Sequence, residues 1–266
     1  MTERARSRNR LLVTDASCGP RLLVSVRSSE EAFAAIEGGA DILDVKEPTR
    51  GSLGMANIEI VAGIARQVDE TRAQHIPLSV ALGEVIDWRE RDDVPALPES
   101  VTFAKLGLSH LARSGGWRDE WLRVRERFDQ RHPTHLEWVA VAYADAEQAA
   151  SPPIHDILEA AVATNCSGLL IDTFTKNGLT LTDCCDATSL CELAERCHSV
   201  GLFLALAGRL SHESLPELSR VPADVLAIRS AACEDADRTA RVSTRAVATF
   251  RNAMQTTAAF ILTPVP

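Results

Sequence analysis

Several features that mark whole classes of protein are missing from this sequence. The first 20 residues contain only a three-residue apolar run, too short for a secretory leader or a membrane span. No excess of basic residues is present either, because the net charge is -9 and the sequence pI is near 5.3. An acidic chain has no general attraction for nucleic acid or anionic membranes, so we expect neither as a partner. Any anionic substrate would need a local cluster of basic groups.

The cysteines form no recognisable framework. Cys184, Cys185, Cys191 and Cys197 are close in sequence, with His198 beside them, but no CxxC pair or histidine spacing supports a metal site. We therefore expect reduced thiols, a cytoplasmic protein, and no metal or organic cofactor.

Low-complexity linkers are also absent, which favours one domain over residues 21–256. Residues 1–20 are expected to form a mobile N-terminal tail, and residues 257–266 a C-terminal tail. Short apolar runs alternate with amphipathic stretches along the domain. Strands are predicted at 22–27, 41–46, 77–82, 102–108, 137–143, 168–174, 202–208 and 224–230. Helices are predicted at 28–39, 57–70, 116–129, 154–165, 187–200, 211–220 and 237–250, while 83–101 is the least regular connection.

Eight strand–helix units in this length predict an α/β protein with a single (β/α)8 TIM barrel. A doubly wound open sheet is the alternative. Its dinucleotide-binding form would carry a GxGxxG motif after the first strand, and none is present.

Charged residues interrupt three of the apolar runs. Asp44 and Lys46 lie two residues apart in DILDVKEP, so they face the same side of a strand. Lys105 follows in FAKLG, and Asp172 and Lys176 in IDTFTKNG. Since barrel active sites lie at the carboxyl ends of the strands, we expect these five residues in one site. A buried ion-pair network is the alternative, but such pairs add little net stability.

Clustered lysines suggest a particular chemistry. Like charges lower the pKa of an ammonium group, and a lysine shifted from ~10.4 towards ~7 can attack a carbonyl to form an imine. Neighbouring carboxylates can move protons, and the remaining lysines can bind phosphate or polarise an oxygen. We therefore expect a small phosphorylated carbonyl compound as the substrate; a homo-oligomer is left open.

Phosphate has a second candidate site at the last two strands. Gly208 ends LALAG, and Arg229 and Ser230 end LAIRS. Loops at these positions of a barrel commonly bind phosphate through backbone N–H groups, and Arg229 could add a bidentate contact. Alternatively, Gly208 only permits a tight turn and Arg229 pairs with Asp172 or Asp44. The glycine-rich loop EPTRGSLG, residues 47–54, could cover the site.

The segments LLVSVRSSEEAFAAIEGGADILDVKEPTRGSLG, AKLGL, GLLIDTFTKNG, LALAGRL and LAIRSAAC resemble the (5-formylfuran-3-yl)methyl phosphate synthases of methanofuran biosynthesis. The resemblance runs from about Leu22 to Arg241 and is weakest over 84–135. It implies a TIM-barrel lyase that condenses two glyceraldehyde 3-phosphate molecules into a furan. It also implies that Lys46 forms the imine, although spacing alone does not rank Lys46 above Lys105 or Lys176.

Three other functions compete with this interpretation. Asp-x-Lys at a strand end resembles the phosphate-barrel decarboxylases, but their Asp-x-Lys-x-x-Asp motif is incomplete here because Thr49 stands at the last position. A class I aldolase would also use the lysines. A non-catalytic barrel that binds a phosphorylated metabolite is the third alternative.

Overall fold

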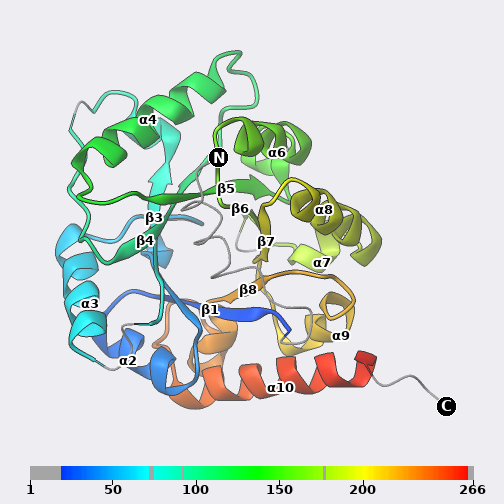
Figure 1. Ribbon diagram of the computed structural model, residues 1–266. Helices are drawn as coiled ribbons and strands as arrows, with labels where there is room; N and C mark the ends of the chain where they lie inside the picture. Colours follow the sequence, from blue (N-terminus) through cyan, green and yellow to red (C-terminus); the bar gives the residue numbers. More distant parts are fainter. Residues whose placement is uncertain (1–18, 72–74, 92, 176–177, 263–266) are drawn as a thin grey trace.

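Eight parallel strands form a closed barrel in the computed structural model, which describes residues 19–71, 75–91, 93–175 and 178–262 (Figure 1). Each strand pairs with the next along the chain, and β1 pairs with β8, so the sheet has no open edge. The strands are β1 (Arg21–Val26), β2 (Ile42–Val45), β3 (Leu78–Glu84), β4 (Val101–Gly107), β5 (Glu137–Tyr143), β6 (Gly168–Asp172), β7 (Phe203–Leu206) and β8 (Val225–Ile228). The predicted TIM barrel is confirmed.

The helices surround the barrel. The longer ones are α2 (Ser29–Glu37), α3 (Ile58–Glu70), α4 (Trp117–Arg131), α6 (Ile154–Ala163), α8 (Ala187–Ser199) and α10 (Thr244–Leu262). Shorter turns are α5 (Ala146–Ala149), α7 (Leu181–Cys184), α9 (Leu215–Leu218), η1 (Pro48–Arg50), η2 (Val85–Trp88), η3 (His212–Ser214), η4 (Ser230–Ala232) and η5 (Glu234–Ala236). No helix among the described residues is long and apolar enough to cross a membrane.

Two sequence predictions differ from the structure. The last helix begins at Thr244 rather than at 237, because residues 233–243 form a loop held by the bridge between Cys233 and Val242. It continues to Leu262, so residues 257–262 belong to a helix rather than to a tail. Between β3 and β4 the described chain has only the short turn η2, in the region that was the least regular in sequence.

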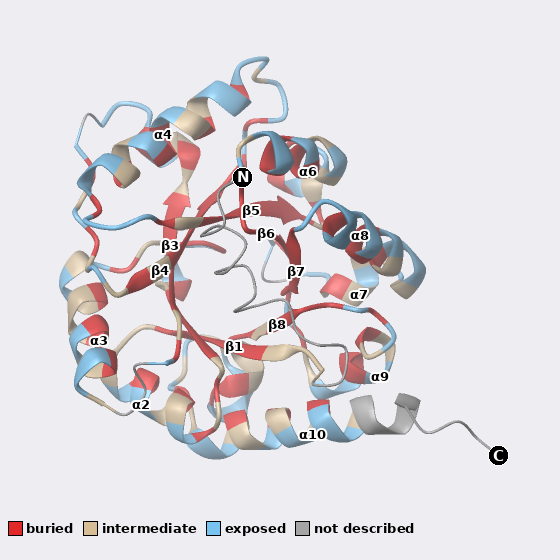
Figure 2. Cartoon of the chain, viewed as in Figure 1, coloured by how far each residue is buried: buried red, intermediate tan, exposed pale blue. Residues whose placement is uncertain are grey.

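Apolar side chains fill two layers. The larger layer lies between the strands and the helices, and the strands are buried while the outer helix faces are exposed (Figure 2). The second layer fills the barrel itself, where Phe103 and Phe203 meet edge to face with ring centroids 6.0 Å apart. Because these rings block the centre of the barrel, polar side chains above them lie over an apolar floor.

Candidate active site

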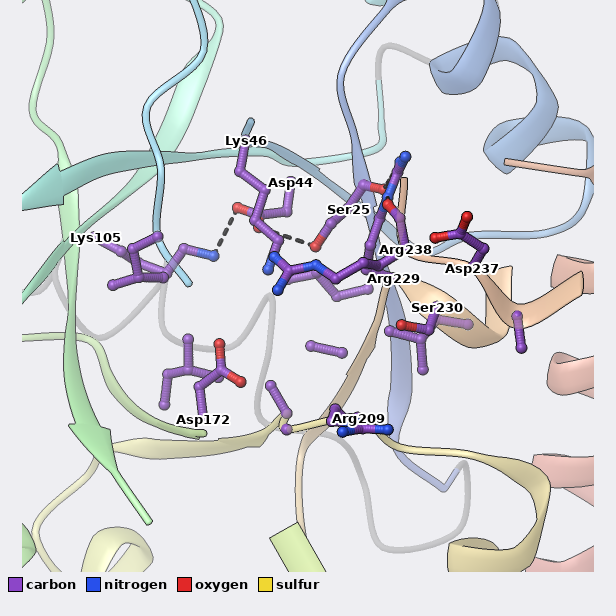
Figure 3. Close-up of a pocket in the computed structure, with 18 residues that line it drawn as sticks. Ser25, Asp44, Lys46, Lys105, Asp172, Arg209, Arg229, Ser230, Asp237 and Arg238 are labelled. Atoms are coloured by element: carbon purple, nitrogen blue, oxygen red, sulfur yellow. Dashed lines mark hydrogen bonds and ion pairs between the residues drawn. The ribbon is translucent and has the colours of Figure 1, made fainter. Parts of the chain in front are cut away.

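A cavity of about 250 Å³ lies inside the barrel. Its lining residues come from the carboxyl ends of the strands and from the loops that follow them (Figure 3). Asp44 is in β2 and Lys46 directly follows it, Lys105 is in β4, and Asp172 is the last residue of β6. The structure thus brings four of the five predicted residues into one cavity. Lys176 lies outside the described residues.

Asp44 and Lys105 form a buried ion pair at the base of this cavity. Lys105 Nζ donates to Asp44 Oδ1 at 2.6 Å, and Ser25 Oγ donates to Asp44 Oδ2 at 3.3 Å. Burial by itself raises the pKa of Asp44, but the charges of Lys105 and Lys46 and the hydrogen bonds from Lys105 and Ser79 hold it below its ordinary value. Asp44 is therefore a carboxylate at neutral pH, with two lysines beside it.

Asp172 is oriented by the loop after β2. Its Oδ1 accepts from the backbone N–H of Thr173 at 2.8 Å, and its Oδ2 accepts from Ser52 Oγ at 2.9 Å. The loop returns on itself through a hydrogen bond from Glu47 N to Gly54 O at 2.8 Å. The predicted covering loop thus orients Asp172 through Ser52 and contributes Leu53 to the cavity wall.

The two glycines of that loop serve different purposes. Gly51 has φ of +107°, a conformation that residues with a Cβ rarely adopt. At Gly54 the backbone packs so closely that an added Cβ would lie 2.4 Å from Glu47 O.

Asp145 holds the segment that follows β6. It accepts from Phe174 N at 2.6 Å and from Thr175 N at 2.9 Å. Burial raises the pKa of Asp145, yet these hydrogen bonds and that of the Thr175 hydroxyl hold it below its ordinary value. The backbone leading toward position 176 is therefore fixed by a buried carboxylate.

Arg229 lines the cavity, but its guanidinium is turned away from Asp44 and Asp172. It forms a buried ion pair with Glu31 through both terminal nitrogens, and those nitrogens also donate to Ser25 O at 3.0 Å and Ala240 O at 2.9 Å. Nε donates to Arg238 O at 2.9 Å. All five N–H groups of this guanidinium are thus engaged. Arg229 is thus in an ion pair, as the alternative to the phosphate contact had it, but with Glu31 rather than with Asp172 or Asp44. No N–H is left for the expected bidentate phosphate contact.

Gly208 and Ser230 also line the cavity. Gly208 has φ of +104°, and an added Cβ would approach Thr173 Cγ2 to 2.9 Å, so the turn itself requires glycine. Their part in binding phosphate stays a prediction.

Sequence reasoning missed two further arginines at the cavity, Arg209 and Arg238, and the carboxylate of Asp237. Arg209 directly follows Gly208 in the LALAGRL segment, which was a usable signal. Arg238 gave none, because it lay within a stretch that was predicted to be helical.

The charge balance at the cavity is opposite in sign to that of the whole chain. Five basic and three acidic side chains line it among the described residues, whereas the whole chain has a net charge of -9. This is the local basic cluster that an anionic substrate requires.

The cysteine run gives no metal centre among the described residues. The one group there with three candidate ligands close together is His155, Asp156 and Glu159 on α6. His198 instead contacts Asp224, with Nε2 2.8 Å from Oδ2. Burial raises the pKa of Cys197 to about 12, which disfavours the thiolate that a metal would bind.

A closed (β/α)8 barrel with lysines and carboxylates at the carboxyl ends of its strands is typical of barrel enzymes. Solved structures support the fold. The chain is similar to thiamine phosphate pyrophosphorylase from Pyrococcus furiosus, with a TM-score of 0.54 and 15% identity over 94% of this chain and 98% of that one. It is also similar to (S)-3-O-geranylgeranylglyceryl phosphate synthase from Thermoplasma acidophilum, with a TM-score of 0.59 and 10% identity over 96% of this chain and 100% of that one.

The family model for 4-HFC-P synthase matches residues 22–251, and the chain belongs to this family of enzymes. It is 34% identical over 230 residues to the (5-formylfuran-3-yl)methyl phosphate synthase of Methanopyrus kandleri, covering 82% of this chain and 92% of that protein. The synthase of Methanococcus maripaludis strain S2 is 36% identical over 230 residues, again with 82% and 92% coverage.

Proposed function

We propose that this protein is a (5-formylfuran-3-yl)methyl phosphate synthase of methanofuran-type cofactor biosynthesis. It condenses two glyceraldehyde 3-phosphate molecules through a lysine imine, with loss of one phosphate and two water molecules. The observation that carries the proposal is the meeting of Asp44, Lys46, Lys105 and Asp172 in one basic cavity, in a chain of the 4-HFC-P synthase family.

Lys46 is the proposed nucleophile. Lys105 Nζ lies 2.6 Å from Asp44, and both side chains are buried. A neutral Lys105 would leave Asp44 without this partner, and an uncompensated buried charge costs several kcal/mol. Lys105 is therefore engaged in this ion pair. Lys46, in the same cavity and less buried, is the more accessible amine and the better candidate to attack the carbonyl.

The imine acidifies the adjacent carbon, because a protonated imine accepts electron density better than a carbonyl does. Asp44 or Asp172 removes the proton, and the resulting enamine attacks the aldehyde of the second substrate molecule. Lys105 stabilises the developing oxyanion; one preorganised donor of this kind is worth about 3–4 kcal/mol. Lys176 was predicted to act with it in expelling phosphate and water.

Borohydride reduction in the presence of glyceraldehyde 3-phosphate tests the imine. We expect a reduced adduct on Lys46, located by peptide mass spectrometry. Lys46→Arg keeps the charge but stays protonated, so it should lose both the adduct and turnover. Lys105→Arg is the matched comparison, since it should keep the adduct on Lys46 while its rate falls.

Turnover is followed by the ultraviolet absorbance of the furan aldehyde together with phosphate release. If Lys46→Arg retains most of the wild-type rate, Lys46 is not the nucleophile. An adduct with carbon–carbon cleavage and no furan would instead identify a class I aldolase. Repeated absence of any adduct would favour a non-catalytic phosphometabolite-binding barrel.

A further inference from the structure

Arg238 bridges two loops at the cavity. It belongs to the connection between β8 and α10, and it lines the cavity with Lys46 and Asp172 (Figure 3). Its Nη2 donates to Pro48 O at 2.9 Å and to Gly51 O at 3.2 Å, both in the loop after β2. The side chain therefore ties the β8 loop to the loop that follows Lys46.

Arg229 holds the backbone around Arg238 in place. Arg229 Nε donates to Arg238 O at 2.9 Å, and Arg229 Nη2 donates to Ala240 O at 2.9 Å. Arg229 itself is held by its buried ion pair with Glu31. These contacts engage the donors of Arg229, and they hold the loop that carries the Arg238 guanidinium to the cavity.

Arg238 has donors that no acceptor among the described residues uses. Both hydrogen bonds that Arg238 donates among the described residues come from Nη2, so Nη1 and Nε have no acceptor there. Burial lowers the pKa of Arg238; Asp172 opposes this effect, and Arg229 and Arg209 add to it. A partly desolvated cation among other cations, with an unused N–H edge, is suited to a doubly charged oxyanion.

We propose that Arg238 binds a substrate phosphate through its Nη1 and Nε edge while Nη2 holds the loop after β2. Phosphate binding and the seating of that loop, which carries Ser52 against Asp172, are thereby coupled. The identity of the molecule that carries the phosphate rests on the proposed function, whereas the phosphate contact does not.

Binding of inorganic phosphate and of glycerol 3-phosphate, measured by isothermal titration calorimetry, tests the contact without any turnover. Glycerol 3-phosphate has no carbonyl and cannot form an imine, so its affinity does not depend on the proposed chemistry. We expect Arg238→Met to weaken both ligands about 10- to 100-fold, the range for a lost hydrogen-bonded charge. Arg238→Lys keeps the charge but not the planar guanidinium, so its affinities should lie between those of the wild type and of Arg238→Met.

Arg241→Met is the matched control, because Arg241 is an exposed arginine of the same loop that does not line the cavity. It should bind both ligands as the wild type does. Wild-type affinity in Arg238→Met and Arg238→Lys would overturn the proposal. If no imine can be trapped but Arg238→Met still loses phosphate affinity as expected, the proposed function is refuted and the phosphate contact stands.

Limited trypsin digestion tests the coupling. Arg50 and Gly51 are exposed in the loop after β2, so their peptide bond is a cleavage site that reports on loop seating. Phosphate should slow cleavage there in the wild type and in Arg241→Met, but not in Arg238→Met. Equal protection in Arg238→Met would show that the two events are independent.

Discussion

Replacing Lys105 by Met removes the ammonium group 2.6 Å from Asp44 and leaves a buried carboxylate. Breaking a buried pair by removing one partner costs about 3–5 kcal/mol, because the other charge stays buried without compensation. Lys46 still lowers the pKa of Asp44, which places the expected loss near the lower end of that range. Arg89→Met, which breaks a pair with Glu120 whose side chains are 47% and 21% exposed, should cost less than about 1 kcal/mol.

The loss should depend on pH. In the wild type the pKa of Asp44 is lowered, so its contribution to stability is present above the unfolded-state pKa of about 3.9 and is lost as pH falls through the folded-state value. Without Lys105, only Lys46 and the hydrogen bond from Ser79 oppose burial, which is the largest effect, and we expect the pKa of Asp44 to be raised. The variant then gains stability relative to the wild type as the pH falls from about 7 to about 4, where Asp44 is protonated.

Urea unfolding at both pH values, followed by tryptophan fluorescence and far-ultraviolet circular dichroism, measures the two effects. The double variant with Asp44→Asn and Lys105→Met should recover much of the loss, since neither position is then charged. The reasoning is refuted if Lys105→Met stays within about 1 kcal/mol of the wild type at neutral pH, or if its loss is the same at both pH values.

Three further predictions concern other parts of the protein. Gly107→Ala would place a Cβ 2.2 Å from Glu84 Oε2. It should therefore displace Glu84 from the Tyr143 hydroxyl, which donates to it at 2.5 Å, and lower the urea midpoint of unfolding. An unchanged midpoint would contradict this. Ser52→Ala removes a hydrogen bond to Asp172 and should lower kcat about 10-fold, while the free energy of unfolding falls by no more than one hydrogen bond is typically worth. An unchanged kcat would show that this bond does not orient Asp172 for catalysis. Treatment with EDTA should leave furan formation unchanged, because the imine supplies the electron sink; activity lost on chelation and restored by a divalent ion would show that a metal is required.

The sequence alone was sufficient to predict the barrel and to bring four of the five charged residues together in one cavity. Eight apolar runs separated by amphipathic stretches specify eight buried parallel strands, because each strand of a barrel is covered on both faces. Charged residues that interrupt such a run near its end are expected at the mouth of the barrel, where the active sites of this fold lie. Asp44, Lys105 and Asp172 could therefore be assigned to one site without any knowledge of their contacts.

Only the tertiary structure decided which charges pair. Arg229 and Glu31 are 198 residues apart in sequence, and they meet because β8 closes the barrel against β1. No local pattern distinguishes this partner from Asp44 or Asp172, since all three are acids near strand ends or helix starts. The position of Arg238 at the cavity could not be predicted for a related reason. Residues before Thr244 have a helical pattern, but hydrogen bonds from Arg229 to Arg238 O and Ala240 O hold them as a loop. Contacts between distant segments outweigh local propensity there, and so the residue proposed to bind phosphate became visible only in the folded chain.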